Sequence, residues 1–279
     1  MNLRLVSDFH TEFFGTASAG KFERILERYF PAAPEDAEQI LICAGDMGKM
    51  QEYDTTYKKL FKILGDRFKE VICVPGNHSW YSTIGVWGKE SEFWREKKLP
   101  DNVHYLDNRF IIIDDVVFIG SCLWTSFDNL NPVAMHHASK VMNDFHTIKT
   151  GYRVQEGPYV NSQTARLTPE QTVERHKESV EYLRDTLEMF RGNKCVVVTH
   201  HAPCSQSVHS YYKGDILNAA YYTDLSELIL EYQPYLWVHG HMHETMSYKI
   251  GETNVCVNAL GYHASSLNYK FEKMAVVEI

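Results

Sequence analysis

The sequence predicts an α/β protein with a mixed sheet or sheets, and three observations support that class. Short apolar runs rich in Val and Ile recur along the chain and are typical of buried strands. In the first third, amphipathic stretches alternate with these runs, whereas strand-type runs predominate in the middle and at the end. The 279 residues, 44% of them hydrophobic, are enough for a packed core. We interpret residues 1–279 as a single domain.

Each predicted strand is a short apolar run, often ending at a glycine or a polar residue. The runs lie at residues 3–7, 39–45, 70–76, 110–114, 116–121, 194–200, 235–240, 253–258 and 274–279.

The predicted helices place apolar residues at helical spacing with charged residues between them. The longest candidate, residues 168–190, has Thr168 as a plausible N-cap and Gln171 to complete a capping box. Gly192 then ends it. The shorter candidates lie at residues 21–30, 53–64 and 88–99.

Residues 122–167 are expected to be irregular, because they are aromatic and polar with little periodicity. A long irregular segment in a compact protein is often functional, so this insertion could form a lid over the active site. The alternative is a surface insertion without a role.

Charge and hydropathy exclude some classes of function. The net charge of −8 argues against general affinity for nucleic acid or membrane surfaces. No apolar run approaches the ~20 residues of a membrane span. The N-terminal stretch "MNLRLVSDFH" meets charges at Arg4 and Asp8, so it lacks the apolar core of a signal peptide. We therefore expect a cytoplasmic protein.

The tripeptide Asp-Phe-His occurs twice, at residues 8–10 and 144–146. A carboxylate and an imidazole two residues apart can both bind one metal ion. The first copy directly follows a strand-type run, at the end where open α/β sheets build their sites. The second copy lies in the irregular segment. We therefore expect Asp8 and His10 to bind metal, and Asp144 and His146 not to.

Four further strand-type runs also end in residues that bind metals or take part in catalysis. These residues are Asp46, Asn77 with His78, His200 with His201, and His241 with His243. Several lie beside a glycine, which lets backbone segments approach closely. Satisfied core histidines and turn carboxylates would not be expected to recur in this way at five strand ends. The pattern favours one shared metal site.

In order, these segments resemble the motifs of the calcineurin-like metallophosphoesterases. The matching segments, Asp8-x-His10, Gly45-Asp46, Gly76-Asn77-His78, His200 and Gly240-His241-x-His243, cover nearly the whole chain. The resemblance implies a mixed-sheet β-sandwich flanked by helices, a four-layer α/β/β/α fold with the metal centre at strand ends. It also implies two metal ions, one bound by Asp8, His10 and His243, the other by Asn77, His200 and His241, with Asp46 bridging both.

The implied chemistry is hydrolysis of a phosphodiester or phosphomonoester. Nitrogen and oxygen ligands without thiolates suit divalent or trivalent Mn, Fe or Zn. A hydroxide bridging the two ions would attack the phosphorus. His78 would lie near the leaving oxygen and donate a proton. His201 follows a ligand and precedes Ala202-Pro203, so we expect it to touch the substrate.

Departures from the family pattern narrow the range of possible substrates. The protein serine/threonine phosphatases of this superfamily carry GDxVDRG and GNHE, whereas this chain has "GDMGKM" and "GNHSWY". Their phosphate-gripping arginine is absent here, and Lys49 stands nearest. "HHAP" and "GHMH" look closer to bacterial-type enzymes acting on small molecules. Two alternatives stay open, a nuclease of the same superfamily and a non-catalytic metal-binding scaffold. The sequence leaves the natural substrate, the native metals and the oligomeric state open.

Overall fold

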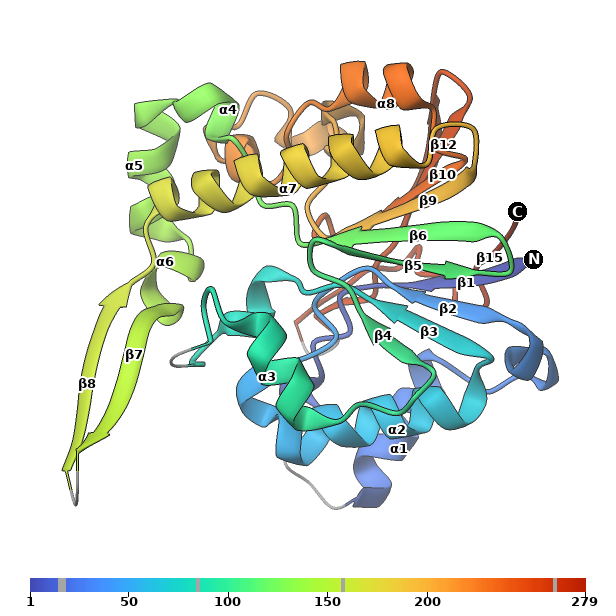
Figure 1. Ribbon diagram of the computed structural model, residues 1–279, viewed down its shortest axis with the longest axis horizontal. Coiled ribbons are helices and arrows are strands. Elements are labelled where there is room, and N and C mark those ends of the chain that lie inside the picture. The colour runs from blue at the N-terminus through green and yellow to red at the C-terminus, as the bar shows by residue number, and fades with distance from the viewer. Residues whose placement is uncertain (15–18, 84–85, 157–158, 263–264) are drawn as a thin grey trace.

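The computed structural model describes residues 1–14, 19–83, 86–156, 159–262 and 265–279. Two β-sheets pack face to face, and helices cover the outer face of each sheet (Figure 1). The N- and C-termini lie side by side, since β1 (Asn2–Val6) pairs with the C-terminal strand β15 (Val276–Glu278).

The first sheet has the strand order β15-β1-β2-β3-β4. Its strands from β1 to β4 are parallel, and β15 runs antiparallel at one edge. The remaining strands are β2 (Ile40–Cys43), β3 (Glu70–Cys73) and β4 (Val103–Tyr105).

The second sheet has the order β11-β12-β10-β9-β6-β5, with four parallel strands in its centre and an antiparallel strand at each edge. Its strands are β5 (Arg109–Ile113), β6 (Val116–Ser121), β9 (Lys194–Thr199), β10 (Leu236–His239), β11 (Thr245–Ile250) and β12 (Thr253–Asn258). Both sheets are therefore mixed, as predicted.

The layers follow from the alternation of side chains along each strand. Ile40 and Ile42 of β2 face the core between the two sheets, where they meet Phe118 and Val198 of the second sheet. Leu41 of β2 faces the opposite way, into the core beneath the first helical layer. Because both faces of both sheets are covered, the strands read as continuous apolar runs. The four-layer α/β/β/α arrangement is confirmed.

Helices lie on the outer faces of both sheets. In Figure 1, α1 (Ala19–Tyr29) and α2 (Lys58–Arg67) lie against the first sheet, while α7 (Pro169–Met189) and α8 (Ser226–Tyr232) lie against the second. α3 covers residues Glu90–Lys97. The predicted capping box of α7 is confirmed, because the Thr168 side chain accepts a hydrogen bond from the Gln171 backbone. Short 3₁₀ helices occupy Thr11–Phe13, Pro34–Glu38, Met50–Glu52, Asn77–Trp80, Ser205–Ser207, Ser210–Tyr212 and Ile216–Ala220, and a π-helical turn occupies Tyr53–Tyr57.

The expectation that residues 122–167 are irregular was wrong. The segment contains α4 (Phe127–Leu130), α5 (Pro132–Val141), α6 (Asp144–Thr147) and a hairpin of β7 (Lys149–Glu156) and β8 (Tyr159–Arg166). α4 and α6 have four residues each, which is too short to show helical periodicity in the sequence. The hairpin extends away from the body of the molecule (Figure 1).

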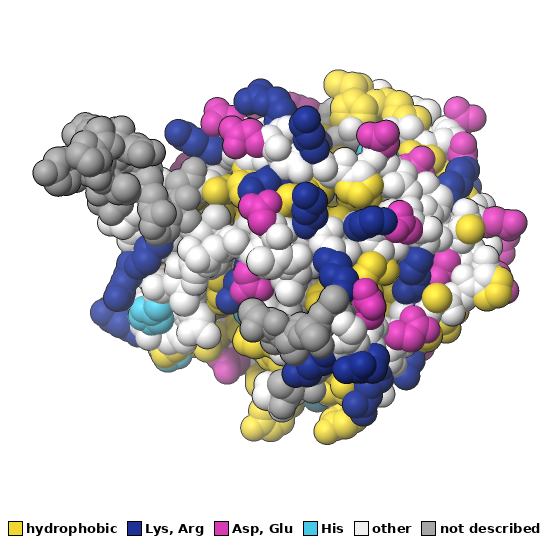
Figure 2. Space-filling model, turned by 90° about the horizontal axis from the view of Figure 1, so that it is seen from below, with side chains coloured by type: hydrophobic (Ala, Val, Ile, Leu, Met, Phe, Trp, Pro, Cys, Tyr) yellow, Lys and Arg dark blue, Asp and Glu magenta, His cyan; other side chains and the backbone are white. Residues whose placement is uncertain are grey.

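A short hairpin of β13 (Gly261–Tyr262) and β14 (Ser266–Leu267) follows the second sheet. Lysine and arginine side chains are interspersed with acidic ones over the face that carries the first helical layer (Figure 2). Within the ranges given above, no helix combines the length and apolar character that crossing a bilayer requires.

Candidate metal centre

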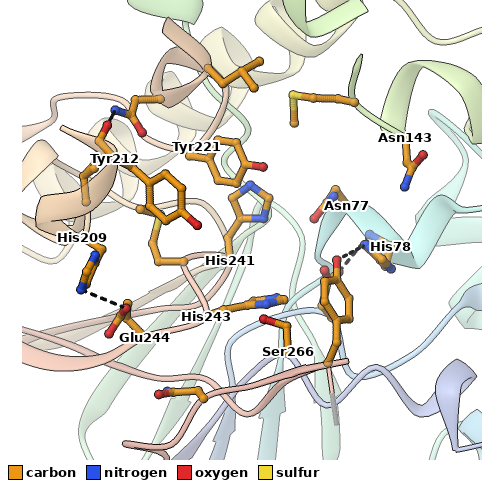
Figure 3. A pocket seen from close by; sticks show the side chains of 18 of the residues that line it. Asn77, His78, Asn143, His209, Tyr212, Tyr221, His241, His243, Glu244 and Ser266 are labelled. Atoms are coloured by element: carbon orange, nitrogen blue, oxygen red, sulfur yellow. Dashed lines mark hydrogen bonds and ion pairs between the residues drawn. The ribbon is translucent and has the colours of Figure 1, made fainter. Parts of the chain in front are cut away.

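Five parallel strands deliver the candidate residues to one edge of the sandwich. β1, β2 and β3 are neighbours in the first sheet, and β9 and β10 are neighbours in the second. Their carboxyl ends are followed by Asp8 and His10, by Asp46, by Asn77 and His78, by His200 and His201, and by His241 and His243. Several of these side chains surround the cavity shown in Figure 3.

Asp8, His10 and His243 form the first ligand group. The Nε2 atom of His243 lies 3.3 Å from Oδ1 of Asp8 and 3.2 Å from Nε2 of His10. Two ring nitrogens and a carboxylate oxygen that face one another at these distances can bind a single cation together.

Asp46, Asn77 and His200 form the second group. Nε2 of His200 lies 3.4 Å from Oδ2 of Asp46 and 3.0 Å from Oδ1 of Asn77. The same Asp46 oxygen lies 3.8 Å from Nε2 of His10, in the first group. Asp46 thus stands between the two groups, within 4 Å of a histidine of each.

One observation at His241 tests whether these residues fit a metal. Its Nε2 atom is buried and has no hydrogen-bond partner. An orphaned buried nitrogen costs free energy unless something binds it, and a neutral imidazole nitrogen is a common metal ligand. His200 also fits, because its Nδ1–H donates to the Ala44 carbonyl at 3.0 Å and leaves Nε2 free.

Five of the seven candidate ligands have a left-handed backbone. The φ angles are 56° at Asp8, 48° at His10, 51° at Asp46, 66° at His241 and 49° at His243. Non-glycine residues adopt this conformation at a cost of about 1–3 kcal/mol each, and such strain clusters at functional sites. The turns after β1, β2 and β10 therefore point side chains into the centre at the expense of stability.

Glycines make the close approach of these side chains possible. A Cβ atom at Gly76 would overlap the Asp46 carboxylate, and one at Gly45 would overlap the His200 ring. Gly45 also has a φ of 88°, which side chains rarely allow.

The carboxylate between the two groups is ionised. Burial alone would raise the pKa of Asp46, but the charges of His200 and His78 outweigh it and hold the pKa well below its usual value. The same pairing raises the pKa of His200 to about 9, although burial opposes it. A buried negative charge among imidazoles is the electrostatic environment that a cation site needs.

Comparisons with known proteins identify the family. The family model for calcineurin-like phosphoesterases matches residues 1–245. The chain belongs to the calcineurin-like phosphoesterase family. An uncharacterized protein of Acanthamoeba polyphaga mimivirus is 28% identical over 280 residues, which cover 96% of this chain and 93% of that one. The crystal structure of the phosphopantetheinyl hydrolase of Mycobacterium tuberculosis is similar in fold, with a TM-score of 0.65 and 19% identity over 94% of this chain and 89% of that one.

Family membership supports metal-dependent hydrolysis of phosphoesters in general terms. Members of the family use divalent metals, and the Asp and His groups described above could hold one.

Glu12 is a functional candidate that the sequence reading missed. Its Oε1 atom lies 2.8 Å from Nδ1 of His78 and 3.2 Å from Nδ1 of His10, with its side chain 1% exposed. Burial would raise the pKa of Glu12, but hydrogen bonds from the two histidines lower it to about 2. The ionised carboxylate holds both Nδ1 atoms protonated and so directs both Nε2 atoms toward the centre. The sequence offered one sign of this role, a carboxylate two residues after His10.

His78 lies at the wall of a cavity in this phosphoesterase. The ring stacks on Tyr81 at 4.0 Å between centroids, and its Nε2 lies 3.3 Å from the Tyr262 hydroxyl. Burial lowers the pKa of His78, but the charge of Asp46 and the bond to Glu12 raise it overall.

The structure places His201 elsewhere than expected. Its side chain is 1% exposed, donates from Nδ1 to the Cys122 carbonyl, and packs between Trp124 and His241. It is not among the residues that line the cavity described below, and its contact with substrate stays a prediction. His201 thus supports His241. His239 is buried, and its Nε2 is hydrogen-bonded with the Ser207 hydroxyl.

The second Asp-Phe-His copy lies closer to the centre than its sequence position indicated. Asp144 is buried, and its Oδ1 accepts a hydrogen bond from Nδ2 of Asn77 at 2.8 Å. His146 points outward and bonds the Lys140 carbonyl.

A cavity of about 680 Å³ opens directly onto the candidate ligands (Figure 3). Tyr212, Tyr221 and His241 stand on one side, and Asn77, His78 and Asn143 on the other. Val141 at the end of α5 and Met142 directly after it contribute to the wall.

Proposed function

We propose that the protein is a dinuclear metallophosphoesterase that hydrolyses a phosphodiester or phosphomonoester of a small molecule. The convergence of seven nitrogen and oxygen ligands from five strand ends is the observation that carries this proposal. Asp8, His10 and His243 would hold one ion and Asn77, His200 and His241 the other, with Asp46 shared. This donor set suits Mn, Fe or Zn.

Two such ions, when bound, would lower the pKa of a water molecule and polarise the phosphate. The chain's own residues set the geometry for that chemistry. Glu12 fixes the tautomer of His10, and the Ala44 carbonyl fixes that of His200. Each ring therefore keeps Nε2 directed at the centre.

His78 would supply the proton to the leaving oxygen. Its Nδ1–H donates to Glu12, so its Nε2 faces the cavity and carries the transferable proton. The Tyr262 hydroxyl now contacts this nitrogen. When substrate displaces it, the hydroxyl is free to donate to a phosphate oxygen, a contact that arginine makes in the protein phosphatases.

The size and lining of the cavity support a substrate with an organic group beyond the phosphate. Its volume exceeds what a phosphate needs and lies in the range of small-molecule sites. Tyr81, Tyr212, Tyr221 and Tyr262 provide flat apolar faces with polar ends, which suit a planar or amide-bearing group.

Charge argues against a nuclease. Among the described lining residues, Lys270 is the sole lysine or arginine, and Asp215 and Glu244 also face the cavity. A nucleic-acid backbone requires a basic surface, which this lining does not provide.

The test is hydrolysis of a chromogenic phosphodiester and a chromogenic phosphomonoester by protein first stripped of metal and then supplied with Mn²⁺ or Zn²⁺. We expect activity that depends on metal and falls with Asp46→Asn. Equal rates with stripped and loaded protein would contradict the proposal. Metal binding without hydrolysis of either ester would favour the non-catalytic scaffold.

A further inference from the structure

The buried contact between Asp144 and Asn77 has no role in the function proposed above. Asn77 offers two chemically different ends of nearly equal size. Its Oδ1 points to His200 and the centre, and its Nδ2 points to Asp144. A flipped amide would present NH₂ to the centre, and an amide NH₂ group has no lone pair to donate to a metal ion.

The partners of Nδ2 decide which end faces the centre. The Tyr81 hydroxyl lies 3.5 Å away and can either donate or accept. The Asp144 carboxylate oxygen, at 2.8 Å, accepts a hydrogen bond from Nδ2 and would repel the carbonyl of a flipped amide. Asp144 therefore favours one orientation, and Tyr81 does not.

The position of Asp144 is fixed by the core around it. Its side chain is 3% exposed. Phe145, the next residue in α6, and Ile148, directly after the helix, are buried in the cluster beneath the first helical layer, and Phe145 packs near Phe127. Because the core fixes the Asp144 carboxylate in place, the carboxylate can fix the orientation of the Asn77 amide.

We propose that Asp144 is a positioning residue that keeps the Asn77 carbonyl directed at the second metal position. This inference rests on the proposed function for the identity of Asn77 as a ligand. It makes α6 a support of the metal centre through one hydrogen bond. Groups that orient a ligand typically change metal affinity 10- to 100-fold when removed.

Asp144 does not bind a metal of its own in this arrangement. Its contact is an amide N–H, and the groups of potential ligands among the described residues do not include it. The expected effect of a substitution is therefore on an existing site.

The experiment is calorimetric titration of Mn²⁺ into the full chain after removal of metal. We expect Asp144→Asn to weaken one of two binding events by about 10- to 100-fold and to leave the other within about threefold. His146→Ala, on the same helix but exposed, serves as the matched control and should change neither event.

A swapped pair gives a sharper test, which also decides the matter if Asp144→Asn does not fold. In Asn77→Asp with Asp144→Asn, the new amide donates to one oxygen of the new carboxylate and leaves the other for the metal. We expect the swap to recover most of the affinity that Asn77→Asp alone loses, because the single variant places two carboxylates together.

Two results would overturn the inference. The first is that Asp144→Asn binds Mn²⁺ with the same two affinities as the wild type. The second is that the swapped double variant binds Mn²⁺ no more tightly than Asn77→Asp alone. Metal affinities that behave as expected in a chain that hydrolyses no ester would refute the proposed function and leave this inference standing. A wild-type chain that binds no metal would refute both.

Discussion

The two Asp-Phe-His copies share three residues and differ in backbone. The first follows β1, and left-handed turns at Asp8 and His10 bring both polar side chains into the centre while Phe9 enters the core. The second forms α6, where residues two apart point in nearly opposite directions. Asp144 therefore faces Asn77, and His146 faces solvent.

This difference teaches that the element holding a motif decides what the motif can do. A strand end with a strained turn can direct both side chains of D-x-H at one ion, whereas a helix can direct only one of them. The absence of metal at the second copy stays a prediction. The buried carboxylate supports the centre instead.

The largest expected effect is at the first copy. His10→Ala should reduce metal occupancy and hydrolysis together, by more than the roughly 10- to 100-fold that follows loss of a supporting group. Elemental analysis and a phosphodiesterase assay on the same preparation would measure both. Full occupancy in this variant would show that the left-handed turn at His10 serves something other than metal binding.

His78 tests whether the surroundings of the first copy also supply a general acid, because Glu12 contacts both His78 and His10. His78→Ala should slow hydrolysis about 10²- to 10⁴-fold while metal occupancy survives. The loss should be largest for alkyl esters, whose leaving groups need the proton most. Unchanged turnover on an alkyl phosphodiester would exclude His78 as the acid.

The segment that carries the second copy packs against α7 through α4 and α5, and a buried histidine of α7 gives it a pH dependence. Burial lowers the pKa of His176 to about 4, and its Nδ1 donates to the Leu123 carbonyl ahead of α4. A histidine whose folded pKa lies below the unfolded value of about 6.5 costs stability as pH falls from there toward 4.

The free energy of unfolding should therefore fall by about 2 kcal/mol more between pH 7 and pH 5 in the wild type than in His176→Gln. Urea titration at the two pH values would measure it. Equal losses in both proteins would place the acid sensitivity elsewhere.

A smaller effect is expected at Met142, where the segment around the second copy meets substrate. Met142→Ala should change the ratio of kcat/KM values between two esters with different organic groups by about 10-fold. Metal content serves as the control and should stay constant. If the ratio stays fixed, the segment supports the centre without shaping the pocket, and its proposed role as a lid fails.

The smallest effect is expected at the outward residue of the second copy. His146→Ala should leave metal occupancy unchanged and stability within about 0.5 kcal/mol, because its ring is exposed. A loss of metal here would contradict the comparison between the two copies.

The sequence by itself determined the fold class, the positions of most strands along the chain, the cap of α7 and the family. Each of these depends on short-range patterns, such as an apolar run that ends at Asp8 or a threonine three residues before Gln171. The helices α4 and α6 were missed because four-residue helices leave no periodic signal.

Only the tertiary structure decided which side chains meet. Glu12 contacts His78 across 66 positions, and Asp144 contacts Asn77 across 67. Such pairs depend on how β3 and α6 are placed by the packed core, and no local pattern records that placement. The packed core also sets where a side chain lies, which is why His201 packs between Trp124 and His241 and Asp144 faces Asn77.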